Sequence, residues 1–190
     1  MEGLLSVFTA FGLSSSAGLN AYIPLLVVAL LARFSDLITL KPPWSALESW
    51  WAIGVLVVLL LIEVFVDKVP AVDSVNDVVQ TFVRPAAGAI LFAGSAGVIS
   101  DAHPVLALIC GLLVSGSVHA VKATARPIIT GTTAGTLNPV VSTAEDVLAF
   151  LIALMAILVP ILCALLMVVL VIWIVRRLRQ RRRKTSPEWW

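Results

Sequence analysis

The sequence predicts an all-α, polytopic membrane protein with about four to six membrane segments, some of them broken or re-entrant hairpins. Two features of the 190-residue chain predict this class: 60% of its residues are apolar and only 13% are charged. A soluble domain carries about 45–50% apolar and about 25% charged residues. With a mean hydropathy of +1.05, the chain has too few charges to cover a surface that faces water, so its surroundings must be lipid.

Uncharged runs place the membrane segments, because a charge in hydrocarbon costs several kcal/mol. They cover residues 3–32, 49–62, 85–100, 127–144 and 147–175. Between Asp101 and Lys122 only His103 and His119 can ionise, so a further segment is expected from Pro104 to about residue 120. A helix needs about 20 residues to cross the ~30 Å hydrocarbon core.

The first run is too long for one simple span, and small and polar side chains interrupt it at residues 14–22. This interruption predicts a broken helix or a re-entrant pair. A cleaved signal peptide is the alternative. The residues before its apolar core include Glu2 and no Lys or Arg, which argues against cleavage.

Trp50 and Trp51 open the next segment, at a predicted membrane interface, and follow a polar loop at residues 35–48. We expect this segment to end near Val66. The last run, residues 147–175, would be about 44 Å long as a straight helix. It must therefore tilt, kink at Pro160 or project from the bilayer.

Seven of the 13 Lys and Arg residues lie in the last 15 positions. We divide the chain into one membrane domain, residues 1–175, and a basic tail, residues 176–190. A basic cluster beside a membrane segment stays in the cytoplasm and touches anionic lipid. The tail therefore predicts a multi-pass protein with a cytoplasmic C-terminus and membrane lipids as partners; nucleic acid is the weaker alternative partner and is not expected.

Two polar stretches break the apolar pattern, each directly after a membrane segment. In the first, Glu63 and Asp67 share one helix face, and the following polar residues recur at spacings of three and four. This pattern predicts an amphipathic helix bounded by Pro70 and Pro85. The polar residues of this stretch are Glu63, Asp67, Lys68, Asp73, Asp77, Gln80 and Arg84.

The second polar stretch begins with His119, Lys122 and Arg126, which form a basic stripe at spacings of three and four. A Gly- and Thr-rich segment at residues 130–138 follows, and Glu145-Asp146 ends the stretch. We expect the Gly- and Thr-rich segment to be non-helical at membrane depth, which requires that it is buried in protein or lines a wet cavity.

The two stretches are related by spacing. Lys68 precedes Pro85 by 17 residues, and Lys122 precedes Pro139 by 17. This match suggests an internal, inverted repeat with halves of about residues 1–100 and 101–175, whose interface would hold a site near the membrane midplane. The alternative is that both stretches are interfacial loops whose basic side chains snorkel to the surface.

Small residues predict close helix packing beside these stretches. Ala89, Ala93 and Gly97 form one ridge, and Gly111 and Ser115 form another that leads to His119. Zinc-protease, CxxC, Walker and G-x-S-x-G motifs are absent from the sequence. The spacing of Asp101, His103 and His119 matches no metal motif. We therefore expect no enzyme activity, no cofactor and no metal.

Several strings resemble one known family: GLNAY at residues 18–22, DKVPAVDS at 67–74, TFVRPAAG at 81–88, HAVKATAR at 119–126 and ED at 145–146. They are similar to the bacterial membrane family called domain of unknown function 4126, and the resemblance extends nearly to the basic tail. It implies a polytopic protein of the bacterial inner membrane with no established activity. That family usually has an Asn-x-Ser-Pro-Glu-Pro-like run before the Glu-Asp pair, whereas residues 130–139 of this chain lack that Glu.

The polar stretches predict a transporter-like protein that moves a small ion or solute through a site formed by two membrane-embedded hairpins. The acids would respond to a cation or proton, the bases would neutralise them or bind an anionic substrate, and His119 would relay protons because imidazole titrates near neutrality. Asn20, Thr130 and Asn138 would line the path. The predicted binding residues are Asn20, Glu63, Asp67, Lys68, Asp73, Asp77, Arg84, His119, Lys122, Arg126, Asn138, Glu145 and Asp146.

Two alternatives to transport remain. Arg84 and Arg126 could clamp the phosphate of a polyprenyl phosphate or a phospholipid, with its apolar tail in the bilayer. The chain could instead be a structural membrane subunit whose polar stripes face another protein. A homo-oligomer is compatible with all three functions.

Overall fold

The computed structural model describes residues 2–66, 70–96, 101, 103–160 and single positions beyond 160, with side chains at residues 2 and 70–77 left undescribed. The described residues form α-helices and one 3₁₀ helix, and no strand occurs among them, which confirms the all-α class. The elements are α1 (Glu2–Leu19), α2 (Tyr22–Phe34), η1 (Trp44–Glu48), α3 (Trp50–Val66), α4 (Pro70–Ser95), α6 (Pro104–Thr133) and α7 (Asn138–Leu158).

Three helices are long and apolar enough to cross a membrane within the described part of the chain: the Val78–Ser95 part of α4, α6 and α7. The helices α1, α2 and α3 are apolar but shorter, at 10–17 residues in their apolar parts. Most large side chains of α3 face outward, including the apolar Val55, Val58, Leu61 and Phe65. The fold is therefore that of a helical membrane protein.

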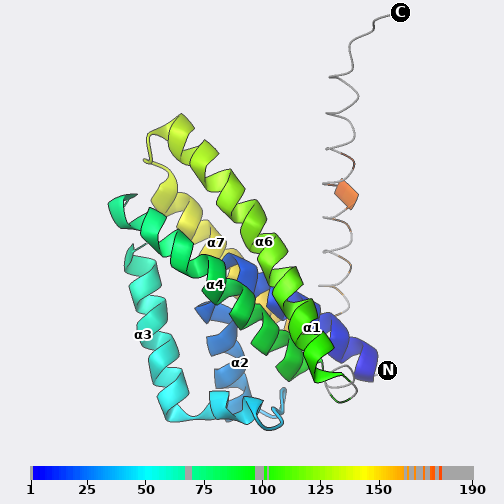
Figure 1. Cartoon of the computed structure of the whole chain (residues 1–190). Helices are drawn as coiled ribbons and strands as arrows, with labels where there is room; N and C mark the ends of the chain where they lie inside the picture. Colours follow the sequence, from blue (N-terminus) through cyan, green and yellow to red (C-terminus); the bar gives the residue numbers. More distant parts are fainter. Residues whose placement is uncertain are drawn as a thin grey trace, which may run out of the picture.

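Helix α1 lies at the centre of the bundle and contacts α2, α4, α6 and α7. In Figure 1 it runs from the N-terminus into the middle of the molecule, and α2 returns from there to the lower edge. The predicted interruption of the first apolar run is present as a break at Asn20 and Ala21. The serines before it are helical: Ser14 Oγ donates to the Gly88 carbonyl at 2.8 Å and Ser16 Oγ to the Ala149 carbonyl at 2.6 Å.

Helices α4 and α6 make the most extensive contact in the bundle and lie side by side in Figure 1. They approach so closely at Gly88 and Gly111 that a Cβ on Gly111 would collide with the Gly88 carbonyl oxygen. A Cβ on Gly88 would collide with the Ser115 side chain. The predicted ridge of Gly111 and Ser115 therefore forms the contact, as expected for small residues between membrane helices. In the other predicted ridge, Ala89 and Ala93 are buried, and Gly97 lies outside the described residues.

The end predicted at Pro85 is wrong, because α4 continues through this proline to Ser95. Proline in a helix interior costs about 3 kcal/mol or more. Packing offsets this cost, since the residues after Pro85 include the fully buried Leu91 and Phe92. The predicted start at Pro70 is correct.

The prediction of non-helical backbone at residues 130–138 is correct for residues 134–137 and wrong for the rest, because α6 runs through Pro127 to Thr133 and α7 begins at Asn138. Thr132 and Thr133 donate their hydroxyls to the carbonyls of Ile128 and Ile129, which satisfies these polar side chains on the helix itself. The helix ends only at Ala134 and Gly135, whose φ angles of 51° and 78° lie in the left-handed region typical of helix C-termini.

One helix, α3, has the ends that the sequence predicts, whereas α7 begins at Asn138, nine residues before the predicted last run. Helix α3 begins at Trp50 and ends at Val66. Helix α7 ends at Leu158, two residues before Pro160, because the residue before a proline disfavours helical backbone. The basic tail from residue 177 onward lies outside the described residues.

A basic and aromatic cluster lies at the start of α3. The Arg33 guanidinium lies 4.2 Å from the centroid of the Trp50 indole ring and donates to the Glu48 carbonyl at 2.7 Å. Such a cluster is typical of a membrane–water boundary, where one side of the aromatic ring is apolar and the other is wet. This end of α3 therefore has the character of an interface.

Candidate functional site

One face of α6 carries the predicted basic stripe into the protein interior. The buried residues at the start of this face are small, namely Ala107, Gly111 and Ser115. Farther along the same face, His119, Lys122 and Arg126 are only 4%, 5% and 7% exposed. The alternative in which these bases snorkel to the surface is therefore wrong for this stripe.

An ion pair between α3 and α4 is completely enclosed. Arg84 Nη2 lies 3.0 Å from Glu63 Oε1, and the two side chains are 0% and 1% exposed. Removing two such charges from water costs several kcal/mol per ion, which only close pairing and further hydrogen bonds recover. The neighbouring Ser115 hydroxyl on α6 donates to the Arg84 backbone carbonyl at 2.7 Å, so α6 positions the arginine from the opposite side.

His119 joins this ion pair to a hydroxyl on α4. Its Nδ1 atom lies 3.2 Å from Arg84 Nη1, and its Nε2 atom lies 3.1 Å from Thr81 Oγ1. Thr81 and Arg84 are three residues apart and so share one face of α4. Helix α4 therefore engages both imidazole nitrogens of His119.

The second half of the stripe pairs with α7. Lys122 Nζ lies 2.8 Å from Glu145 Oε2, and Arg126 Nη2 lies 3.2 Å from the same oxygen. Lys122 also donates to the Leu19 carbonyl at the end of α1, at 2.9 Å. A helix C-terminus carries partial negative charge, so the end of α1 helps to hold this ammonium group inside the bundle.

Asn20 shapes the break that makes the Leu19 carbonyl accessible. Its Oδ1 atom accepts the backbone N–H groups of Tyr22 and Ile23, both at 3.0 Å, and so caps the start of α2. Its Nδ2 atom donates to Asp146 Oδ1 on α7 at 2.9 Å. The side chain is only 1% exposed. The predicted site residue Asn20 is therefore a cap that also holds α7.

Asn20→Ala is expected to destabilise the protein by about 1–2 kcal/mol, because it removes the cap of α2. Asn20→Asp is the matched variant: it keeps a capping oxygen but places a carboxylate against Asp146. Unfolding in detergent, followed by tryptophan fluorescence, measures both changes. The cap assignment would be contradicted if Asn20→Ala unfolded at the same denaturant concentration as the parent protein.

These contacts form one cluster, which we call the polar core. The Lys122 ammonium is close enough to Arg84 and Arg126 to be repelled by both, so the pairs on α4 and α7 are electrostatically connected through α6. The polar core consists of Asn20, Glu63, Gln80, Thr81, Arg84, His119, Lys122, Arg126, Glu145 and Asp146.

Not every predicted site residue belongs to this cluster. Asn138 Oδ1 accepts the Thr130 hydroxyl at 3.1 Å, and this bond closes the turn between α6 and α7. Pro85 lies inside α4 whereas Pro139 lies in the first turn of α7, so these two prolines do not occupy matching positions. The side chains of Asp67, Lys68, Asp73 and Asp77 lie outside the described residues.

The family comparison confirms the resemblance seen in the sequence. The family described as Domain of unknown function (DUF4126) matches residues 7–180. The chain belongs to this family. No curated protein and no solved structure matches it. In this DUF4126 protein the polar core is therefore the feature that points to a function.

Sequence reasoning missed three contributors to the site. Thr81 binds His119, and Ser115 binds the Arg84 backbone, although the sequence marked Ser115 only as a packing residue. The Tyr22 hydroxyl, at the start of α2, forms a side-chain hydrogen bond with Gln80. The sequence offered one sign of this contact, because Gln80 lies on the polar stripe of α4.

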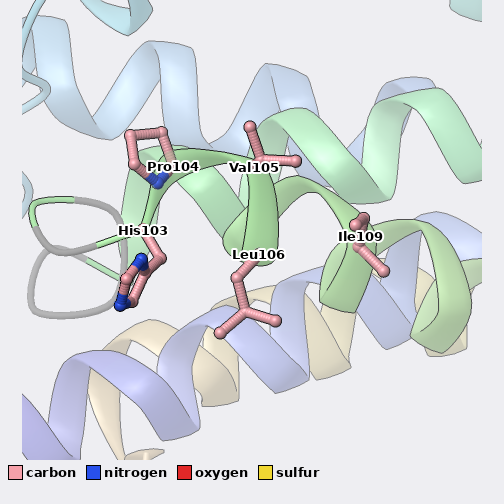
Figure 2. Close-up of a pocket in the computed structure, with 5 residues that line it drawn as sticks. All are labelled: His103, Pro104, Val105, Leu106 and Ile109. Atoms are coloured by element: carbon pink, nitrogen blue, oxygen red, sulfur yellow. The ribbon is translucent and has the colours of Figure 1, made fainter.

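The described part of the DUF4126 chain holds no group of three potential metal ligands. His103 lies one residue before α6, and His119 lies 16 residues farther on, about 24 Å along a helix. Figure 2 shows His103 beside Pro104, Val105, Leu106 and Ile109, which line a surface hollow of about 470 Å³. This hollow lies at the opposite end of α6 from the polar core.

An apolar groove lies beside the polar core. It has a volume of about 390 Å³ and is formed by α2, α3 and α7. Asp146, which Asn20 binds, is the charged residue among the described side chains that line it. The groove is lined by Ile23, Leu26, Val27, Leu30, Leu60, Asp146, Val147 and Phe150.

Proposed function

We propose that this DUF4126 protein is a transporter-like membrane protein that moves a small ion or solute through the polar core. The observation that carries the proposal is the enclosure of ionisable side chains from α3, α4, α6 and α7 within a bundle of largely apolar helices. Ionisable residues inside membrane segments are rare and typically mark substrate or ion pathways.

The pairing pattern supports a site built from two hairpins. Glu63 and Arg84 pair within the α3–α4 hairpin, and Arg126 and Glu145 pair within the α6–α7 hairpin. Lys122 connects the second pair to the end of α1. Each hairpin thus supplies an acid and a base, as expected for a site between two repeat-like halves.

Energetics also favour function over structure. Replacing a buried ion pair with apolar residues is often neutral or stabilising, so a fold has no need of such pairs for stability alone.

We further propose the inner membrane of a bacterium as the location, with the C-terminus in the cytoplasm. We assign neither a chemical reaction nor a cofactor to the polar core.

Reconstitution in liposomes tests the proposal. Purified protein is placed in vesicles that contain a pH-sensitive dye, and gradients of sodium chloride, potassium chloride, potassium nitrate and potassium phosphate are imposed in turn. We expect at least one gradient to change the internal pH faster than in protein-free vesicles. We expect Lys122→Met to lower this rate towards that of protein-free vesicles, because the variant removes a buried charge of the polar core.

Lys41→Met is the matched control, because Lys41 is an exposed lysine paired with Asp101 at the surface. This variant should transport at the parental rate. Vesicles with protein that behave like empty vesicles under all four gradients would contradict the proposal.

A lipid-phosphate binder is the second candidate, and the apolar groove favours it. A groove of about 390 Å³ beside the polar core offers room for part of a lipid chain, and Arg84 and Arg126 supply the cations that a phosphate group requires. Native mass spectrometry tests this candidate. A retained anionic lipid that is lost in Arg126→Gln would support it, and a protein that retains no anionic lipid would contradict it.

A further inference from the structure

The hydrogen bonds of His119 define its protonation state. Arginine has donors and no acceptor, so the contact between Arg84 Nη1 and His119 Nδ1 requires Nδ1 to accept. The imidazole is therefore neutral, with its proton on Nε2. That proton faces Thr81 Oγ1 at 3.1 Å, where the hydroxyl oxygen accepts it.

Protonation of His119 would break this arrangement. A proton from water that binds Nδ1 makes an imidazolium with both nitrogens protonated, and it places two N–H donors 3.2 Å apart. Arg84 Nη1 then loses its acceptor while Nη2 stays with Glu63. Arg84 Nε already has no hydrogen-bond partner in the structure, so the guanidinium would present donors to a new ligand.

Charge balance indicates the ligand class. Among the polar-core residues whose side chains are described, three cations stand against three carboxylates while His119 is neutral, and an imidazolium adds a fourth cation. An uncompensated buried charge is costly, so an anion would stabilise the protonated state. Among the described side chains, the other charged and titratable groups of the polar core and of its neighbour Tyr22 are Tyr22 on α2, Glu63 on α3, Arg84 on α4, Lys122 and Arg126 on α6, and Glu145 and Asp146 on α7.

We propose that the polar core binds a small inorganic anion together with a proton, which His119 takes up at Nδ1 as Arg84 is released to the anion. The proposal rests on the proposed transport function and names its cargo class. When the anion leaves, the same proton returns to water and Nδ1 again accepts from Arg84. Proton and anion binding must then strengthen each other by the same factor.

The chain offers a clean test because it has only two histidines. His103→Gln removes the exposed one and leaves His119 as the only imidazole, provided that the affinity tag contains no histidine. Nitrogen-15 NMR of histidine-labelled protein in lipid reports the tautomer. We expect the neutral form with its proton on Nε2 at high pH; a proton on Nδ1 would overturn the proposal.

The second readout is the protonation equilibrium of His119 at a fixed, mildly acidic pH. We expect the ratio of protonated to neutral His119 to rise at least about fivefold when potassium gluconate is replaced by chloride, nitrate or phosphate. The rise should disappear in Arg84→Gln. If that variant does not fold, Glu63→Gln with Arg84→Gln leaves a neutral pair in its place.

The two proposals fail separately. An unchanged ratio with all three anions would overturn coupled proton and anion binding, even if the liposomes transport a cation. If the ratio of protonated to neutral His119 depends on the anion but the liposomes show no transport, the binding site would be supported and the transport function contradicted.

Discussion

Arg84→Ala is expected to destabilise the protein by about 3–5 kcal/mol, because removing one partner of a buried ion pair leaves an uncompensated charge. The charge left behind belongs to Glu63, whose side chain is 1% exposed. His119 loses the donor to its Nδ1 atom at the same time. Denaturant unfolding in detergent, followed by tryptophan fluorescence, measures the change.

A second variant separates charge from packing. Arg84→Ala combined with Glu63→Gln removes the stranded carboxylate and should recover part of the loss. Lys41→Ala, which breaks an exposed pair, should change stability little. A loss in Arg84→Ala no larger than that in Lys41→Ala would contradict the buried pair.

Gly111→Leu is expected to separate α4 from α6 and to cost at least about 1–3 kcal/mol, the usual cost of overpacking. Even a Cβ at this position collides with the Gly88 carbonyl oxygen, which belongs to backbone and has little freedom to move. Gly111→Ala should therefore also destabilise the protein. The same unfolding measurement in detergent reports both changes.

Gly54→Ala is the matched control for this contact. Nothing lies within 4 Å of a Cβ at Gly54, and alanine is favoured over glycine in a helix by about 0.5–1 kcal/mol. The change from glycine to alanine should thus raise the free energy of unfolding at position 54 and lower it at position 111. Equal effects of Gly54→Ala and Gly111→Ala would show that α4 and α6 do not meet at Gly111.

The sequence predicted the parts of the fold that depend on helical period. The spacing of His119, Lys122 and Arg126 placed all three on one face of α6, and the structure buries that face. Proline, which usually ends a helix, predicted the wrong end for α4. Pro85 and Pro127 both lie inside helices, and around Pro85 the buried Leu91 and Phe92 hold α4 in the bundle.

The pairing of charges was not predictable from the sequence. Nothing in the spacing indicates that Glu145 is shared by Lys122 and Arg126, or that Glu63 binds Arg84. These partners lie on different helices, and only the three-dimensional packing brings them together. The Leu19 carbonyl accepts from Lys122 because it lies at the end of a helix, and this backbone contact cannot be recognised from the residue type at position 19.

We propose that the buried charges serve transport and that the fold does not depend on them. Glu63→Leu combined with Arg84→Met tests it most directly, because this variant replaces the enclosed ion pair with apolar side chains of similar size. We expect stability equal to or above that of the parent protein, together with loss of the ion-driven pH change in liposomes. A stable double variant that transports at the parental rate would contradict the account.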